Sequence, residues 1–288
     1  MATDWFEAID TYCERTDATL WSEPLNALSN LAFIAAFVAS VYCYRRYREE
    51  AGQHRWEFVL LLGLLCAIGI GSFLFHTFAT RWALVADVGP ITLFQFAYLG
   101  IFCWHMLAPR WWVVLAGWAA FVVTTLLLAI PFPADYANGS SSYFSGLLFI
   151  ALLGGYSHHA QKEGAWLVLL ATPLFMTALL FRSIDQQACD AFPPGTHFLW
   201  HLFNGGMLYC LFAGLVAGSA CPANVRRLRW ICRSRGSWSR AATAAVELSN
   251  LDVPPPPFNH RLSPAADPWP PFRCHRLVGT VTQQPLSP

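Results

Sequence analysis

The sequence predicts an all-α membrane protein: a seven-transmembrane helical bundle with its N-terminus outside and its C-terminus in the cytoplasm. Its composition, its apolar runs and its distribution of arginine lead to this prediction. Of the 288 residues, 56% are hydrophobic and 12% are charged, whereas about 25% of the residues of a typical soluble domain carry charge. The formal net charge of +1 gives no indication of nucleic-acid binding. The expected partner is therefore a lipid bilayer and not a nucleic acid.

The part of the chain from residue 25 to residue 220 consists largely of apolar runs. Each run is roughly 18–24 residues long, about the length that crosses the hydrocarbon core of a bilayer. The runs lie at 25–44, 57–78, 84–107, 111–130, 143–160, 165–182 and 197–219. Because irregular backbone cannot face lipid, all seven segments are expected to be helices of one bundle.

The orientation follows from arginine and lysine, which favour the cytoplasmic side of a membrane. One side carries the larger set: Arg45, Arg46, Arg48, Arg55, Arg110, Lys162, Arg226, Arg227, Arg229 and Arg233. The opposite side carries Arg15, Arg81 and Arg182. This bias places the N-terminus outside and the C-terminus in the cytoplasm, in agreement with an odd number of spans.

Three histidines fall inside these apolar segments. With this topology His76 lies near the outer end of the second span, and His197 and His201 lie near the outer start of the seventh. Asp87 lies about one turn into the third span, and Ser72 lies four residues before His76, on the same helical face. Five polar groups from three helices are therefore expected at one depth of the membrane.

Each of these residues also has a simpler explanation when it is taken alone. A single intramembrane histidine is usually a hydrogen-bonded packing residue, and Asp87 could pair with Arg81 at the interface. Two histidines one helical turn apart suit a tetrahedral metal site better than either alone. Together with His76 they form the three-histidine set that holds a catalytic zinc with one position open. The combination predicts a zinc site with His76, His197 and His201 as ligands.

The same residues carry a resemblance to a known family. Ser72 and His76 at a spacing of four, Asp87 eleven residues later, and His197 with His201 resemble the alkaline ceramidase family. That family belongs to a superfamily of seven-span membrane hydrolases that includes the adiponectin-receptor-like proteins. By this resemblance the three histidines would bind zinc, Asp87 would contact the zinc-bound water, and Ser72 would assist the substrate carbonyl.

The resemblance covers about residues 10–220 and includes the segment Glu23 to Asn30 at the entrance of the first span. It implies a zinc-dependent amidohydrolase, a ceramidase that cleaves a ceramide-like lipid into a sphingoid base and a fatty acid. Zinc lowers the pKa of bound water to about 7 and polarises a carbonyl oxygen, which suits an unreactive amide. The sequence shows no Gly-x-Ser-x-Gly elbow that would indicate a serine nucleophile.

The resemblance also implies a calcium site in the N-terminal segment. Its candidate ligands are Glu14, Glu23 and Asn26. The segment between Glu14 and Glu23 is shorter than in the animal enzymes, and Arg15 and Thr16 stand where acidic or amide residues are expected. The simpler alternative is a hydrated acidic cap at a helix start. The family further implies a disulfide between Cys13 and Cys189, which both fall in outer segments.

Two other classes of function remain open at this point. A seven-span receptor-like lipid-binding protein could use the zinc structurally, although such a site would not need Asp87. A transporter would be expected to show inverted repeats or broken helices at the midplane, and the sequence shows neither.

The chain is expected to divide into three parts: an outer segment (1–24), the seven-span bundle (25–220) and a tail (221–288). The tail is basic and then rich in proline, a composition typical of disorder. Little lysine with abundant arginine, alanine and proline points to a bacterial source, for which the membrane would be the plasma (inner) membrane. The oligomeric state is not indicated by the sequence.

Overall fold

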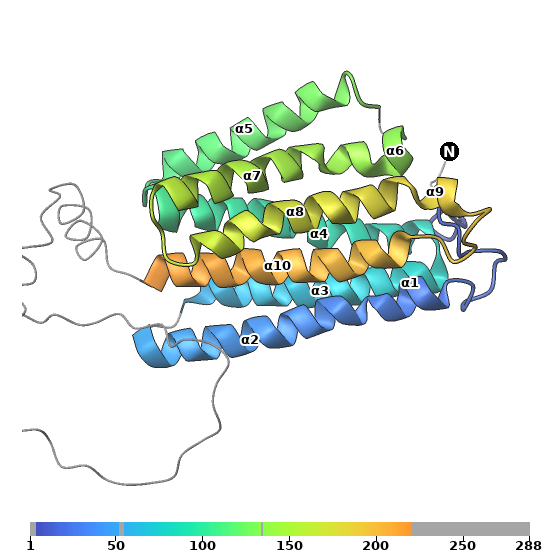
Figure 1. Ribbon diagram of the computed structural model, residues 1–288, viewed down its shortest axis with the longest axis horizontal. Helices are drawn as coiled ribbons and strands as arrows, with labels where there is room; N and C mark the ends of the chain where they lie inside the picture. The colour runs from blue at the N-terminus through green and yellow to red at the C-terminus, as the bar shows by residue number, and fades with distance from the viewer. Residues whose placement is uncertain (1–3, 52–54, 134, 221–288) are drawn as a thin grey trace, which may run out of the picture. The chain divides into compact units, whose positions relative to one another are not determined.

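A computed structural model describes residues 4–51, 55–133 and 135–220 of the chain. These residues form a bundle of long, roughly antiparallel helices (Figure 1), and an isolated bridge pairs Ala8 with Thr80. The helices are α1 (Pro24–Ser29), α2 (Leu31–Ala51), α3 (Trp56–Phe78), α4 (Arg81–Phe102), η1 (Cys103–Leu107), α5 (Trp111–Ala129), α6 (Tyr136–Gly139), η2 (Ser140–Tyr143), α7 (Phe144–His159), α8 (Ala165–Ser183), α9 (Asp185–Ala188) and α10 (His197–Ala220). The predicted tail at 221–288 lies outside the described residues.

Each of the seven predicted apolar runs is helical, which confirms the all-α prediction. The first run differs most from its predicted bounds, because it divides at Asn30 into α1 and α2 and continues to Ala51. Among the residues that the structure describes, six helical segments are long and apolar enough to cross a bilayer: Pro24–Arg48, Trp56–Phe78, Arg81–Leu107, Trp111–Ala129, Ala165–Ser183 and His197–Ser219. The remaining helix of the bundle, α7, has 16 residues. The protein is therefore a multi-pass helical membrane protein.

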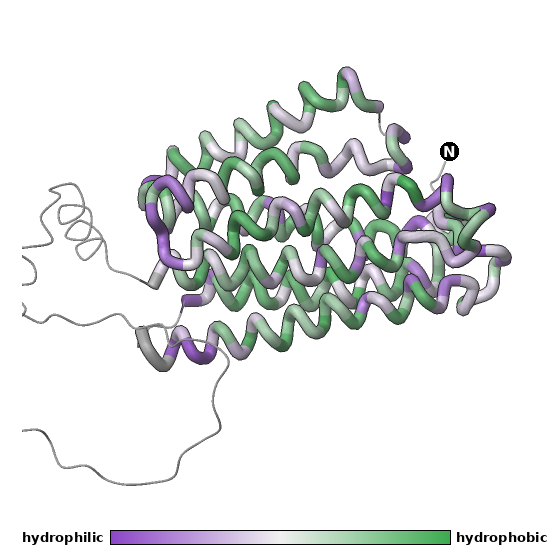
Figure 2. The backbone as a smooth tube through the Cα atoms, in the orientation of Figure 1, coloured by the Kyte–Doolittle hydropathy of each residue, from purple (hydrophilic) through white to green (hydrophobic). Residues whose placement is uncertain are grey.

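The apolar surface has the distribution expected of such a protein. Hydrophobic residues run along the helices, and hydrophilic residues gather at the two ends of the bundle (Figure 2). Exposed tryptophans lie at both ends, with Trp56 and Trp111 at one end and Trp5 and Trp21 at the other. Tryptophan favours the membrane–water interfaces, so the two ends of the bundle match the two interfaces of a bilayer.

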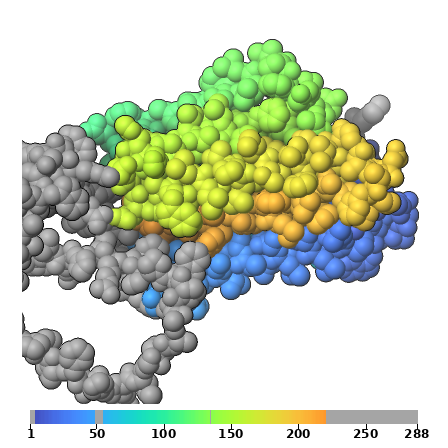
Figure 3. Space-filling model, viewed as in Figure 1, coloured from blue at the N-terminus to red at the C-terminus, as the bar shows by residue number. Residues whose placement is uncertain are grey.

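Helix α10 forms the centre of the bundle. It packs against α8 on one side and α2 on the other, and its atoms show only as a strip between those helices in Figure 3. In the span that α10 provides, 78% of the residues are buried inside the protein, against 6% in α5. A polar group on α10 is therefore held on several sides by neighbouring helices, whereas α5 mostly faces lipid.

A close contact between α3 and α4 depends on Gly71 and Pro90. Proline has no backbone N–H, so Pro90 leaves the carbonyl oxygen of Ala86, four residues earlier, without its helical partner. That oxygen faces Gly71, where an added Cβ would lie 2.0 Å from it. Glycine is thus required at residue 71, and the contact fixes the part of α4 that carries Asp87 against α3.

The disulfide between Cys13 and Cys189 joins the N-terminal segment to the loop between α9 and α10. The two cysteines are 176 residues apart in the chain, so the bond closes a loop that contains the helices from α1 to α9 but not α10. Among the described cysteines, Cys66, Cys103 and Cys210 form no disulfide.

Replacing Cys13 by serine is expected to lower the stability of the bundle by about 2–5 kcal/mol, because the open chain gains conformational freedom in its unfolded state. The measurement is thermal unfolding of the purified protein in detergent, together with peptide mapping without reduction. Cys66→Ser, at a free and partly buried cysteine, is the control and should behave as the wild type. Detection of Cys13 and Cys189 as free thiols would contradict the pairing.

Candidate metal centre

The structure brings the three histidines of the sequence prediction together at one end of the bundle. His76 comes from the last turn of α3, and His197 and His201 come from the first two turns of α10. Their ligand atoms all lie within 4.8 Å of one another. All three side chains are buried, so the cluster is shielded from solvent by protein.

The ring nitrogens are arranged as metal ligands require. The Nδ1 atom of His76 donates to Glu23 Oε2 at 2.6 Å. The Nδ1 atom of His201 lies 2.6 Å from Ser29 Oγ, which itself donates to the carbonyl of Asn26. Nδ1 of His197 and Nε2 of His201 are buried without a partner among the described residues.

Buried nitrogens without partners are rare and call for an explanation. A carboxylate or hydroxyl on the second ring nitrogen is the usual arrangement for a metal-binding histidine, because it fixes the tautomer and the ring orientation. Two of the three rings, those of His76 and His201, have this arrangement, and three clustered imidazoles fit zinc with a fourth position open. The cluster can therefore hold a metal ion, and its donors favour zinc.

Glu23 is the residue that orients His76. Its Oε1 atom accepts from Arg15 Nε at 2.6 Å, and its Oε2 atom also accepts from Asn26 Nδ2 at 3.2 Å. Burial alone would raise the pKa of Glu23, but the hydrogen bonds and charges of His76 and Arg15 outweigh burial and hold that pKa below its ordinary value. Glu23 is thus an anion that holds the His76 ring in place.

Asp185 positions His197, and the sequence analysis did not identify it. Its Oδ1 atom accepts from the backbone N–H groups of Thr196 and His197 at 2.7 and 2.9 Å, and its Oδ2 atom accepts from Cys13 N at 3.1 Å. The carboxylate therefore caps the first turn of α10. Gly195 makes this approach possible, since it has φ +66° and an added Cβ would lie 2.2 Å from Asp185 Oδ1.

Tyr12 covers one face of the His197 ring. The two rings stack with their centroids 3.6 Å apart, and Arg182 Nη1 donates to the Tyr12 hydroxyl at 2.5 Å. Burial raises the pKa of Tyr12, so this hydroxyl stays protonated. Arg182, which the sequence analysis used only for orientation, lies in the last turn of α8 with its side chain directed toward the metal centre.

The structure also brings Asp87 and Ser72 to the centre. Ser72 is buried one turn before His76 on α3, and its side chain lies close to the Asp87 carboxylate. Asp87 also lies within electrostatic range of His76 and Arg182. The alternative pairing of Asp87 with Arg81 does not occur, because Arg81 Nε donates to Glu7 Oε2 at 2.6 Å. A carboxylate and a hydroxyl thus lie beside the three histidines.

The residues predicted for calcium come together, but the arrangement does not fit a calcium ion. Glu14 accepts from the backbone N–H groups of Leu25 and Asn26 at 2.6 and 2.7 Å and so caps α1. Burial raises the pKa of Glu14, against the effect of these two bonds. Both oxygens of Glu23 are also engaged. Of the side-chain oxygens of these three described residues, only Asn26 Oδ1 has no hydrogen-bond partner. Calcium needs roughly six to eight oxygen ligands.

Arg15 supplies the positive charge in this segment. Besides Glu23, its guanidinium donates to the carbonyl oxygens of Asp17 and Thr19 at 3.2 and 3.3 Å, and to that of His76 at 3.3 Å. The Arg15 side chain therefore connects the N-terminal turn, the Glu23 carboxylate and the end of α3. A bound cation could make the same contacts with these oxygen atoms.

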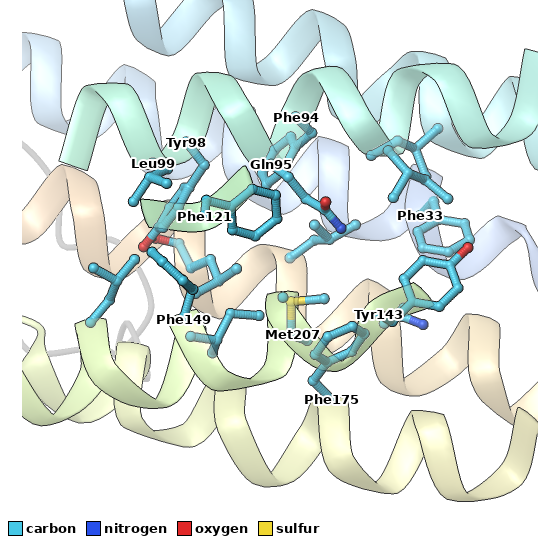
Figure 4. Close-up of a pocket in the computed structure, with 18 of the residues that line it drawn as sticks. Phe33, Phe94, Gln95, Tyr98, Leu99, Phe121, Tyr143, Phe149, Phe175 and Met207 are labelled. Carbon is cyan, nitrogen blue, oxygen red and sulfur yellow. The ribbon is translucent and has the colours of Figure 1, made fainter. Parts of the chain in front are cut away.

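An apolar pocket lies inside the bundle close to the metal centre. Trp200, next to His201, and Phe33, whose ring contacts His201, line the end of the pocket near the centre. Leu153 and Leu211 line it farther along the helices. Figure 4 shows aromatic side chains around this space, with the amide of Gln95 among them. The apolar lining of the pocket suits a hydrocarbon chain.

A comparison with family models identifies the chain. The model described as Ceramidase matches residues 9–234, which is more than half of the 288 residues. The protein belongs to the ceramidase family. No curated protein and no solved structure matches the chain. The match includes every residue of the metal centre, and it supports a ceramidase-like amide hydrolase with a lipid substrate.

Replacing His197 or His201 of this ceramidase-family protein by alanine is expected to abolish zinc binding, because two imidazoles are too few for the site. Zinc in the purified protein, measured by mass spectrometry of the metal, should fall from about one per chain to near zero. His158→Ala changes an exposed histidine at the other end of α7 and should leave the zinc content unchanged. Full zinc content in both ligand variants would contradict the site.

The Arg15 arrangement predicts a stability that does not depend on calcium. Neither added calcium nor a calcium-selective chelator should shift the melting temperature of the wild type. Arg15→Gln should cost about 3 kcal/mol, because it leaves the buried Glu23 carboxylate without its ion-pair partner. Arg81→Gln, which breaks an exposed pair with Glu7, is the control and should have little effect. A rise in melting temperature with calcium would restore the calcium prediction.

Proposed function

We propose that the protein is a zinc-dependent intramembrane amide hydrolase that cleaves ceramide-like N-acyl sphingolipids into a sphingoid base and a fatty acid. The observation that carries the proposal is the buried cluster of His76, His197 and His201, in which two ring nitrogens lack a partner among the described residues. Asp87 lies within electrostatic range of His76. A purely structural metal would not require a carboxylate next to an open position. The family match supports the hydrolase class, and the apolar pocket supports a lipid substrate.

Zinc, when bound by the three histidines, supplies a Lewis acid and lowers the pKa of a water ligand to about 7. Asp87 is the general base and acid of the reaction: it accepts the proton of the attacking water and returns it to the leaving amine. The water oxygen bonds to the amide carbon, the carbon–nitrogen bond breaks, and a fatty acid and an amine result. Ser72 donates a hydrogen bond to the negative oxygen that develops on the acyl carbon.

The remaining residues position these groups. Glu23 and Ser29 orient the rings of His76 and His201, and Asp185 holds the first turn of α10 in place. The contact of Gly71 with Ala86 sets the distance between the α3 histidine and Asp87. Fixed geometry of this kind matters because misplacement by about 1 Å can reduce a rate roughly hundredfold.

We further propose seven membrane spans, with α7 as the fifth. At 1.5 Å per residue the 16 residues of α7 extend about 24 Å. The four residues of η2 that precede it add about 8 Å, which together match a hydrocarbon core of about 30 Å. The bias of arginine and lysine supports an outer N-terminus and a cytoplasmic C-terminus, and hence a metal centre near the outer face of, in a bacterium, the plasma membrane.

The test of the function is to incubate the purified protein with a ceramide, an N-acyl amino lipid and an ester lipid, with and without a zinc chelator. Mass spectrometry should detect a sphingoid base and a fatty acid from the ceramide, and the chelator should stop the reaction. Asp87→Asn should lower kcat by about a hundredfold or more while zinc stays bound. Binding of ceramide without any hydrolysis by the wild type would instead favour a receptor-like lipid-binding protein.

A matched pair of glycine variants separates the position of Asp87 from its chemistry. Gly71→Ala forces α3 and α4 apart and should lower kcat strongly while the zinc content stays unchanged. Gly63→Ala, on the same helix with nothing within 4 Å of the added Cβ, should keep full activity. Equal activity of the two variants would show that the close contact is not needed for catalysis.

A further inference from the structure

Arg182 has surroundings unlike those of the other arginines at this end of the bundle. Its guanidinium lies over three aromatic rings, 5.6 Å from the centroid of Tyr12, 5.5 Å from that of Tyr143 and 5.4 Å from that of Trp200. Cation–π contacts of this kind hold a guanidinium in place. The N–H groups that do not point toward a ring can still donate hydrogen bonds. The side chain is thus fixed in position by rings rather than by an anion.

The hydrogen-bonding capacity of Arg182 is not used up. Its Nη1 atom donates to Tyr12, but its buried Nε atom has no partner among the described residues. No ion pair joins it to a described carboxylate, whereas Arg15 and Arg81 each pair with a glutamate at 2.6 Å. A buried cation without a direct ion-pair partner is costly, and Asp87 lies within electrostatic range of Arg182 without forming an ion pair with it. Arg182 is therefore suited to receive an anionic group from a ligand.

The location of Arg182 indicates which part of a ligand it would meet. Tyr12, on one side of it, stacks on His197 of the metal centre. Tyr143 and Trp200, on the other side, line the apolar pocket, and Figure 4 shows Tyr143 near one end of the labelled residues. The guanidinium thus lies where the metal centre meets the pocket. The polar end of an acyl lipid would lie there when its chain occupies the pocket.

We propose that Arg182 binds the carboxylate of an acyl lipid at this junction. A guanidinium pairs with a carboxylate more strongly than with a neutral oxygen and can hold both of its oxygens. Two sources would supply this group: the fatty acid that the proposed hydrolysis releases, and the head of an N-acyl amino acid offered as substrate. The first source rests on the proposed function, whereas the binding itself does not require turnover.

The test measures binding and not activity. Hexadecanoic acid and hexadecan-1-ol are titrated into the full-length protein in detergent at alkaline pH, where the acid is ionised. A zinc chelator is present, because a metal ion would itself bind a carboxylate. The wild type should bind the acid at least tenfold more tightly than the alcohol, since the chains are alike and only the charged end differs. N-hexadecanoylglycine in the same assay reports the second source.

Variants assign the preference to one side chain. Arg182→Gln should bind the acid and the alcohol about equally, and Arg182→Lys should keep part of the preference. Arg110→Gln is the control, because Arg110 also lies over a tryptophan, at 5.7 Å from the Trp112 ring, but in the loop before α5. It should keep the full preference for the acid.

The outcomes are distinct from those of the hydrolysis assay. Equal affinity of the wild type for acid and alcohol would overturn the proposal, as would an undiminished preference in Arg182→Gln. If Arg182→Gln does not fold, the wild-type ratio and the lysine variant still decide. If hexadecanoic acid binds tightly and N-hexadecanoylglycine does not, the site is selective for the fatty-acid product. If both bind tightly, the site also accepts N-acyl amino acids. If the wild type hydrolyses no lipid but still binds the acid more tightly than the alcohol, the proposed hydrolase function is refuted and the carboxylate site is supported.

Discussion

The hydrogen bond between Glu23 and His76 is the contact on which the arrangement of the metal centre depends. An imidazole near the end of an apolar bundle needs a partner for its second nitrogen, and the helices offer few polar groups. The segments outside the long helices supply them: Glu23 precedes α1, Ser29 ends α1, and Asp185 lies in α9. The short connecting segments therefore determine the ring orientations, while the long helices determine where the rings meet.

The helices and the histidine cluster could be predicted from the sequence because they depend on local periodicity. Apolar length located the helices, and a spacing of four residues placed His197 and His201 on one face of α10. Asp185 and Arg182 could not be found in this way. Asp185 acts on a helix that starts twelve residues later, and Arg182 owes its surroundings to Tyr12, which is 170 residues away. Gly195 and Thr196, just before His197, were the local sequence sign that α10 has a capped start.

The N-terminal segment shows a different limit of sequence reasoning. The residues named as calcium ligands lie together in the fold, because Glu14 and Glu23 each accept a hydrogen bond from Asn26. The sequence did not reveal that Arg15 would turn toward Glu23 and donate to the carbonyl of His76. An arginine can take over the contacts of a cation only when several acceptors surround it, and that depends on tertiary structure. Similarly, the close contact of α3 and α4 at Gly71 depends on Pro90, which lies on α4.

The disulfide between Cys13 and Cys189 has a consequence for biogenesis. Ribosomes make the N-terminal segment first, but its partner cysteine emerges 176 residues later, after six of the long helices have left the ribosome. The segment that contributes Tyr12, Arg15 and Glu23 must therefore wait for the last loop before it can be locked over the histidines. An incomplete chain also lacks α10 and hence two of the three imidazoles. A nascent or truncated protein thus has no assembled reaction centre, and the membrane in which it is synthesised is not exposed to an unfinished lipid hydrolase.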